Sequence, residues 1–167
     1  MIWSARQPIW AAGFRPLFPL ACLAGLILPL WWALIYTGAV QPAPSFTQAP
    51  LQWHAHEMFY GYGWALLGGF LLTASKNWVG VRGWQGGALL SLCVAWLLDR
   101  IANSFGTGWP PALFWIATAL FQIGIVYMLM HTLLQQKVRG GSSDNYFFWI
   151  ALPLFLPAKF LILQGDF

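Results

Sequence analysis

Charged residues are scarce in this chain of 167 residues: lysine and arginine number eight, aspartate and glutamate four, and together they make up 7% of the sequence. A soluble domain usually carries about 25% charged residues. Hydrophobic residues make up 59%, and a soluble chain of this length could not keep so much apolar surface out of water. The shortage of charge therefore excludes an ordinary soluble domain and indicates an integral membrane protein. We expect no nucleic-acid partner, because the positions of the basic residues explain the net charge of +4 better.

Cysteine is almost absent as well. Cys22 and Cys93 both fall in apolar stretches, where small buried thiols are common. Two isolated cysteines provide no disulfide framework and no cysteine-based metal site. The first apolar stretch is longer than the roughly 7–15 residues of a signal-peptide core and has no convincing cleavage site, so we expect it to be retained.

What the chain has instead is a series of long apolar segments. A helix needs roughly 17–25 residues to cross a bilayer, and five segments fit: about 16–36, 58–75, 84–105, 110–134 and 145–163. Their continuous apolar character favours helices over the alternating pattern of membrane strands. The sequence predicts an all-α integral membrane protein, with one membrane domain over residues 1–167 and five transmembrane helices in the lipid bilayer.

The basic residues around these segments are distributed unevenly. If the N-terminus is cytoplasmic, six of them share that side: Arg6, Arg15, Lys76, Arg82, Lys137 and Arg139. Arg100 then falls at the opposite face. Cytoplasmic loops are enriched in lysine and arginine, so the sequence predicts a cytoplasmic N-terminus and a periplasmic C-terminus.

The segment Trp53-His54-Ala55-His56-Glu57-Met58 places several ionisable groups at the start of an apolar run. Such groups usually have a partner or a task, and imidazole is the commonest side-chain ligand of transition metals and haem iron. On one regular helix the two imidazoles would point about 200° apart, so they could share an ion only if His54 lay in extended backbone. Otherwise each serves a separate centre, or both are interfacial polar residues without a ligand. Glu57 could fix the tautomer of an imidazole.

Small residues recur every four positions along the second predicted span, at Gly61, Ala65, Gly69 and Thr73. This spacing lets another helix approach closely. The same smooth face would also leave room for a flat macrocycle. Close packing of helices needs no cofactor, whereas the interpretation as space for a macrocycle requires one.

Asp99 and Arg100 are predicted at the outer end of the third span, in the same layer as the two histidines. Neighbouring positions on a helix point apart, so we do not expect these two side chains to pair mainly with each other. Arg100 could reach Glu57 in an interhelical ion pair, or hold a carboxylate of a ligand such as a haem propionate.

Two further ionisable residues lie within apolar segments. His131 is predicted near the cytoplasmic end of the fourth span, far from His54 and His56, so it would be a separate ligand or a snorkelling polar residue. Lys159 has no clear partner on its own helix, and a buried ammonium needs one. Its partner is expected on another span, in another subunit or in a region outside this sequence.

Several motifs, in order along the chain, resemble those of the NnrS family. They are Gly13-Phe14-Arg15-Pro16-Leu17-Phe18, the Trp53–Met58 segment, Gly69-Phe70-Leu71-Leu72-Thr73-Ala74 followed by Asn77-Trp78, Asp99-Arg100-Ile101-Ala102, and Asn145-Tyr146-Phe147-Phe148. The resemblance covers nearly the whole chain. It implies that the chain corresponds to the N-terminal part of a longer bundle, in which other helices or subunits would supply the C-terminal spans.

Members of this family are bacterial inner-membrane proteins described as binding haem and copper, and linked to nitric oxide metabolism during denitrification or nitrosative stress. The resemblance therefore implies a multi-pass protein of the bacterial inner membrane with nitric oxide as a ligand. It implies His54 and His56 as metal or haem ligands, with Arg15, Glu57 and Arg100 as supporting residues. Apart from the resemblance, His131 is a third, separate candidate ligand, and Met58 and Asp99 are further candidate supporting residues.

The expected function is thus a haem- and copper-binding membrane protein of the nitric oxide response. The alternative is a membrane transport or scaffold role without a bound cofactor. The sequence contains no convincing catalytic base or nucleophile, so we make no prediction of turnover.

Overall fold

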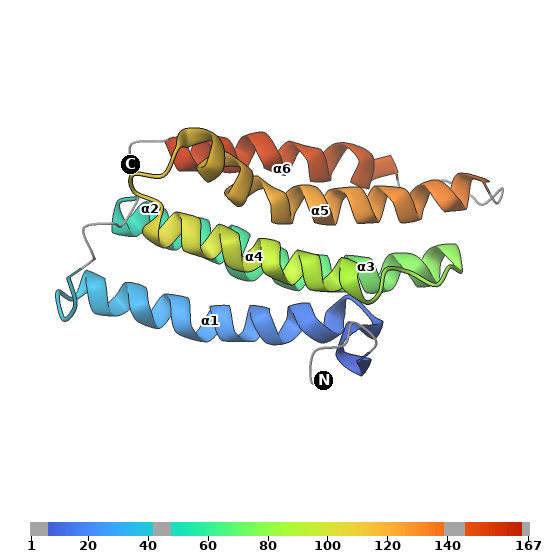
Figure 1. Cartoon of the computed structure of the whole chain (residues 1–167), viewed down its shortest axis with the longest axis horizontal. Coiled ribbons are helices and arrows are strands. Elements are labelled where there is room, and N and C mark those ends of the chain that lie inside the picture. Colours follow the sequence, from blue (N-terminus) through green and yellow to red (C-terminus); the bar gives the residue numbers. More distant parts are fainter. Residues whose placement is uncertain (1–6, 42–47, 139–145, 165–167) are drawn as a thin grey trace.

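The structure is a computed structural model that describes residues 7–41, 48–138 and 146–164, and these residues form helices and short connections without any strand. The helices lie side by side in one elongated bundle (Figure 1). In chain order they are η1 (Pro8–Ala11), α1 (Phe14–Tyr36), α2 (Pro50–His56), η2 (Glu57–Gly63), α3 (Trp64–Val79), α4 (Gly87–Phe105), α5 (Pro111–Val138) and α6 (Tyr146–Gln164).

Four of these helices are long and apolar enough to cross a membrane: α1, α4, α5 and α6. They confirm four of the five predicted spans. The second predicted span, 58–75, lies in η2 and α3, and α3 by itself has 16 residues. The crossing of the membrane by this segment therefore stays a prediction.

Three successive elements, α2, η2 and α3, continue one another from Pro50 to Val79 without a gap. The middle element is a π-helix of seven residues that begins at Glu57. A π-helical turn is wider than an α-helical turn and is rare, and such turns occur frequently at functional sites. The predicted polar motif therefore lies at the junction between a short α-helix and a widened turn.

Successive long helices run in opposite directions, and η1 and the last turns of α6 lie towards opposite ends of the bundle (Figure 1). The main packing partners are α4 with α5, α1 with α3, and α3 with α5. Helix α6 lies against α5 and α2. Which end faces the cytoplasm remains a prediction from the distribution of basic residues.

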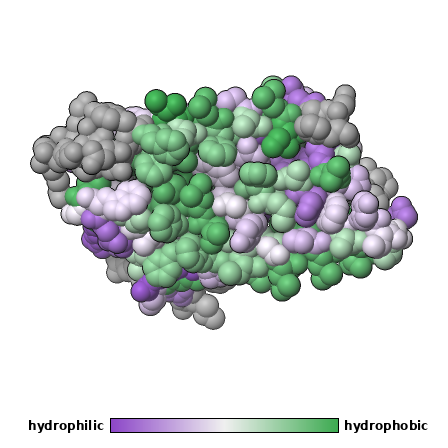
Figure 2. Space-filling view, turned by 180° about the vertical axis from the view of Figure 1, so that it is seen from behind, coloured by the Kyte–Doolittle hydropathy of each residue, from purple (hydrophilic) through white to green (hydrophobic). Residues whose placement is uncertain are grey.

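The outer surface of the bundle is largely apolar. Figure 2 shows hydrophobic residues along the length of one face, with the most hydrophilic residues mainly towards the two ends. Leu26 on α1, Ile150 on α6 and Leu161 on α6 each expose 68% of their surface. Large apolar side chains in such numbers on the outside are expected of a surface that faces lipid.

The small residues of α3 serve close packing between helices. A Cβ atom on Gly69 would lie 2.9 Å from Phe18 Cδ1 and 3.1 Å from Leu17 Cβ, both on α1. Thr73 Oγ1 accepts a hydrogen bond from the backbone N–H of Phe14 at 3.0 Å and donates to Gly69 O at 2.8 Å. Protein side chains thus occupy the space beside this part of the stripe, which leaves no room there for a macrocycle.

The other half of the stripe faces different neighbours. Ala65 is completely buried. Gly61 lies beneath the guanidinium of Arg100, and Gly61 O accepts a hydrogen bond from Trp96 Nε1 at 2.8 Å. The missing side chain at Gly61 therefore lets a charged group of α4 approach the backbone of η2.

Candidate functional site

Several ionisable residues lie together in the interior of the bundle. Five ionisable residues from four elements form an interior polar network, in which every member is at least nine-tenths buried: His56 (α2), Glu57 (η2), Asp99 and Arg100 (α4) and Lys159 (α6). Two carboxylates face two cations, so the network balances its charge. Burying charge is costly unless it is paired, and this pairing explains how the bundle tolerates it.

His56 lies at one end of the network and is fully buried. Its Nδ1 lies 3.1 Å from Glu57 Oε1. Its other ring nitrogen, Nε2, is buried and has no hydrogen-bond partner. The ring also lies 5.3 Å from the ring of Tyr60. With the proton on Nδ1 donated to Glu57, Nε2 carries a free lone pair in the protein interior.

Glu57 connects the histidine to α4. Its Oε2 lies 2.9 Å from Arg100 Nε, so the predicted reach of Arg100 to Glu57 is confirmed. Arg100 Nη2 also donates to Asp99 Oδ2 at 2.7 Å. The two neighbours therefore do pair, but not mainly with each other, because Arg100 also pairs with Glu57 of η2 and Asp99 also pairs with Lys159 of α6.

Lys159 finds its partners on two other spans. Its Nζ donates to Asp99 Oδ2 at 2.7 Å and to the backbone oxygen of Thr118 on α5. It also lies 5.3 Å from the centre of the Tyr60 ring. The prediction of a partner on another span is confirmed, and no missing subunit is needed to neutralise this ammonium group.

Side-chain amides form hydrogen bonds that join α2 and the residues before it to α6 and α4. Gln52 Nε2 donates to the backbone oxygen of Ile162 on α6 at 2.6 Å. Gln48 Nε2 donates to Asn103 Oδ1 at 2.7 Å, and Asn103 Nδ2 donates to Asp99 Oδ1 at 2.7 Å. These contacts fix the position from which His56 enters the interior.

His54 has different surroundings from His56. Its ring stacks on Trp32 of α1, with 4.3 Å between ring centres. Partial burial lowers the pKa of His54 from its usual value, and its Nδ1 has no hydrogen-bond partner. The hypothesis that His54 lies in extended backbone was wrong, because α2 already includes it. The two imidazoles are therefore placed for separate contacts and not for one shared ion.

His131 lies at the opposite end of the bundle. Its ring centre is 5.0 Å from that of Trp84, in the connection between α3 and α4. That connection is joined to η1, since the Gly86 N–H donates to Trp10 O at 2.8 Å. His54, by contrast, stacks near the C-terminal end of α1. The predicted separation of His131 from the other two histidines agrees with this arrangement.

Two predicted supporting residues lie outside the interior polar network. Arg15 Nη1 donates to Pro8 O at 2.7 Å, at the end of the bundle occupied by η1. Met58 is partly exposed on η2. Neither of them contributes an ion pair or a hydrogen bond to the network among the contacts that the structure describes.

The described donors would suit haem iron better than copper. One imidazole is enough to ligate haem iron, and the buried Nε2 of His56, which has no hydrogen-bond partner, would be that donor. Copper usually takes several nitrogen or sulfur donors. Within residues 7–41, 48–138 and 146–164, no group of three or more histidine, cysteine, aspartate or glutamate side chains could hold a metal ion.

Several residues around the interior polar network were not identified from the sequence. The residues that contact its ionisable groups are Tyr60, Trp96, Asn103 and Thr118. Gln122 on α5 is 1% exposed, and neither its Nε2 nor its Oε1 has a hydrogen-bond partner. The isolated glutamine and threonine within an otherwise apolar span were the available clue, since polar residues in spans usually face the interior.

The fold and the site together define a helical membrane bundle with a charge-balanced polar interior. A family model described as NnrS protein matches residues 8–166. The chain belongs to the NnrS family, as its motifs predicted. No curated protein and no solved structure matches the chain.

Proposed function

We propose that this chain acts in the nitric oxide response of the bacterial inner membrane and that His56 ligates haem iron. Membership of the NnrS family supports this proposal. The single observation that carries it is the His56 imidazole, which is fully buried with an unpartnered Nε2. Such a nitrogen loses its hydrogen bonds to water without gaining others, which is costly unless a ligand takes their place.

The chain's own residues would prepare this nitrogen for coordination. Glu57 would accept a hydrogen bond from the Nδ1–H of His56, which would fix the tautomer and raise the basicity of Nε2. Arg100 Nε lies 2.9 Å from Glu57 Oε2, and its positive charge favours the carboxylate form of Glu57. The apolar bundle around them excludes water. When bound, haem iron supplies a centre that coordinates nitric oxide directly.

His54, with Met58 one turn further along the chain, is the second candidate for ligand binding, at a separate centre beside Trp32. Any copper site would need donors in addition to the described residues of this chain. We therefore assign haem to His56 and assign no copper to the described residues. The cytoplasmic N-terminus predicted from the basic residues would place both histidines at the periplasmic end.

The test is the haem content of detergent-purified protein, together with its visible spectrum before and after addition of nitric oxide. We expect a Soret band that shifts with nitric oxide. His56→Gly should lose the band, and added imidazole should restore it by occupying the vacated position. His131→Ala is the matched control, because it removes an imidazole at the opposite end and should leave the band unchanged.

Folding must be checked in each variant by far-UV circular dichroism and gel filtration. If folded His56→Gly protein kept its full haem content and its nitric oxide shift, the assignment to His56 would be wrong. If His54→Ala lost the Soret band and His56→Gly kept it, His54 and not His56 would be the haem ligand.

A second candidate function is transport or scaffolding without a cofactor. The charge balance of the interior polar network favours it, because Glu57, Asp99, Arg100 and Lys159 already satisfy one another without a metal. A colourless, metal-free and folded preparation that takes up no haem would support this alternative.

A further inference from the structure

A cavity lies at the end of the bundle opposite to His54, and it is independent of the proposed haem ligand. It has a volume of about 250 Å³ and is lined by Val81, Arg82, Gly83, Trp84, His131, Thr132 and Gln135. We refer to it as the loop pocket, since the connection between α3 and α4 forms one wall and the last turns of α5 form the other. We infer that the loop pocket binds the phosphate group of an anionic phospholipid.

The wall formed by the connection is held in a defined shape. Gly80, Gly83 and Gly86 all have positive φ angles, at 69°, 72° and 62°, which residues with side chains rarely adopt. Trp84 Nε1 donates to the backbone oxygen of Met128 on α5 at 2.8 Å, which joins the two walls. The pocket is therefore preformed, and binding would not have to order the loop.

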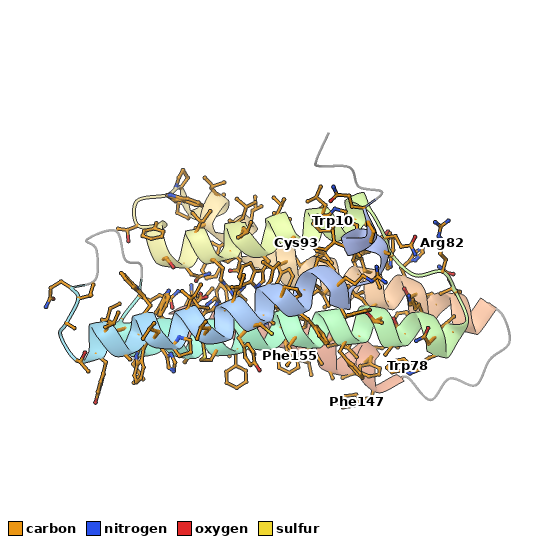
Figure 3. All side chains as sticks on the ribbon, turned by 90° about the horizontal axis from the view of Figure 1, so that it is seen from below. Trp10, Trp78, Arg82, Cys93, Phe147 and Phe155 are labelled. Atoms are coloured by element: carbon orange, nitrogen blue, oxygen red, sulfur yellow. The ribbon has the colours of Figure 1, made fainter. Side chains whose placement is uncertain are left out.

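The same connection is also joined to the N-terminal segment. Gly86 N–H donates to Trp10 O at 2.8 Å, and Gln85 Nε2 donates to Ala11 O at 3.2 Å. Figure 3 shows Arg82 at the same end of the bundle as Trp10 and Trp78. The loop pocket thus lies where the membrane helices end and the headgroup layer of the bilayer begins.

The charge of the loop pocket favours an anion. Arg82 is exposed, and its Nε donates to Gln85 Oε1 at 3.1 Å, which orients the guanidinium and leaves its terminal nitrogens for a ligand. His131 and Gln135 add side-chain donors on the opposite wall.

No carboxylate is among the lining residues of the loop pocket, and the two acidic residues within the described ranges, Glu57 and Asp99, are paired in the interior. Lys76 packs its aliphatic stem against Gly83, which brings a second cation beside the pocket.

The residues around the loop pocket favour a lipid as its ligand. Aromatic rings of Trp84 and Tyr127 flank His131, with ring centres 5.0 and 6.2 Å from the imidazole. Aromatic and basic residues together are typical of the membrane interface, and basic pockets between membrane helices recognise anionic headgroups. Guanidinium groups also match the geometry of phosphate oxygens.

Native mass spectrometry of the full chain in detergent tests the inference. The probes are phosphatidylglycerol and phosphatidylcholine with the same acyl chains, and glycerol phosphate as a phosphate ester without a tail. We expect preferential retention of phosphatidylglycerol. Arg82→Gln should weaken it about fivefold, as expected for the loss of one basic residue near an anionic headgroup. Arg82→Lys keeps the charge and should recover most of the binding.

Arg15→Gln is the matched control, because Arg15 is a basic residue at the same end that bonds Pro8 O and does not line the pocket. Circular dichroism of each variant establishes that it is folded. Equal retention of both lipids, or an equal loss in Arg15→Gln and Arg82→Gln, would overturn the inference. If glycerol phosphate bound as tightly as phosphatidylglycerol, the inference of a lipid ligand would be wrong, and the loop pocket would instead bind a soluble phosphate ester.

Discussion

Lys159 donates a hydrogen bond to Asp99 across 60 residues of sequence, and 2.7 Å separates Nζ from Oδ2. This contact links α6 to α4 in the protein interior. Asp99 Oδ2 is also bonded by Arg100, so one carboxylate oxygen serves two cations. The pair therefore joins the last described helix to the network that begins at His56.

Removal of the Lys159 ammonium should destabilise the bundle. Breaking a buried ion pair typically costs about 3–5 kcal/mol, and we expect the low end for Lys159→Met because Asp99 keeps its ion pair with Arg100. The free energy of unfolding can be measured by titration with sodium dodecyl sulfate in mixed micelles. Lys76→Met is the control on a partly exposed lysine, which should change stability by less than about 0.5 kcal/mol.

A double-mutant cycle separates the ion pair from the general cost of substitution. Lys159→Met combined with Asp99→Asn should cost less than the sum of the two single changes, because the double variant leaves no uncompensated charge between these positions. Strict additivity would show that the two side chains do not interact in the folded protein.

Glu57→Gln should weaken haem binding without removing the ligand itself. The amide cannot hold the Nδ1 proton of His56 as strongly as a carboxylate, and loss of such an outer partner typically costs 10–100-fold in metal affinity. Haem titration followed by the Soret band measures the dissociation constant. Gln135→Ala, beside His131 at the opposite end, provides the comparison and should leave the affinity unchanged.

Gly61→Ala tests the close approach of α4 to η2. The added Cβ would collide with Arg100 Nη1 and lie 2.9 Å from Glu57 Oε2, so we expect a loss of about 1–3 kcal/mol of stability. Gly87→Ala is the matched control, since a Cβ at the start of α4 meets nothing within 4 Å. A Gly61→Ala protein as stable as the Gly87→Ala protein would contradict the described geometry.

Gln122→Leu should stabilise the protein, although it changes a buried residue. Both polar atoms of Gln122 are buried without hydrogen bonds, and an unsatisfied buried polar group costs about 1–3 kcal/mol. Leucine has a similar volume and removes that cost. Unfolding in mixed micelles measures the gain, and Thr118→Val is the comparison, because the Thr118 hydroxyl already bonds Trp115 O on its own helix. A clear loss of stability in Gln122→Leu would indicate that Gln122 binds a ligand or water.

The sequence by itself determined the class of the protein. Scarce charge and long apolar segments specify membrane helices, because unpaired backbone groups and charges are costly in hydrocarbon. The motifs also identified the family and the polar segment around His56 and Glu57. These properties depend on residues close together in the chain, so composition and spacing reveal them directly.

The tertiary structure decided which of those residues meet. The π-helical turn at Glu57 changes the direction of the side chains that follow it, and helix periodicity does not predict such a turn. Lys159 reaches Asp99 of α4 only because α6 packs against α5 and α2, while α1 covers half of the stripe of small residues. His54 and His56 are two positions apart in the chain, yet they face α1 and the interior respectively. Contacts between distant segments depend on how the helices pack, and for that reason local patterns could not assign them.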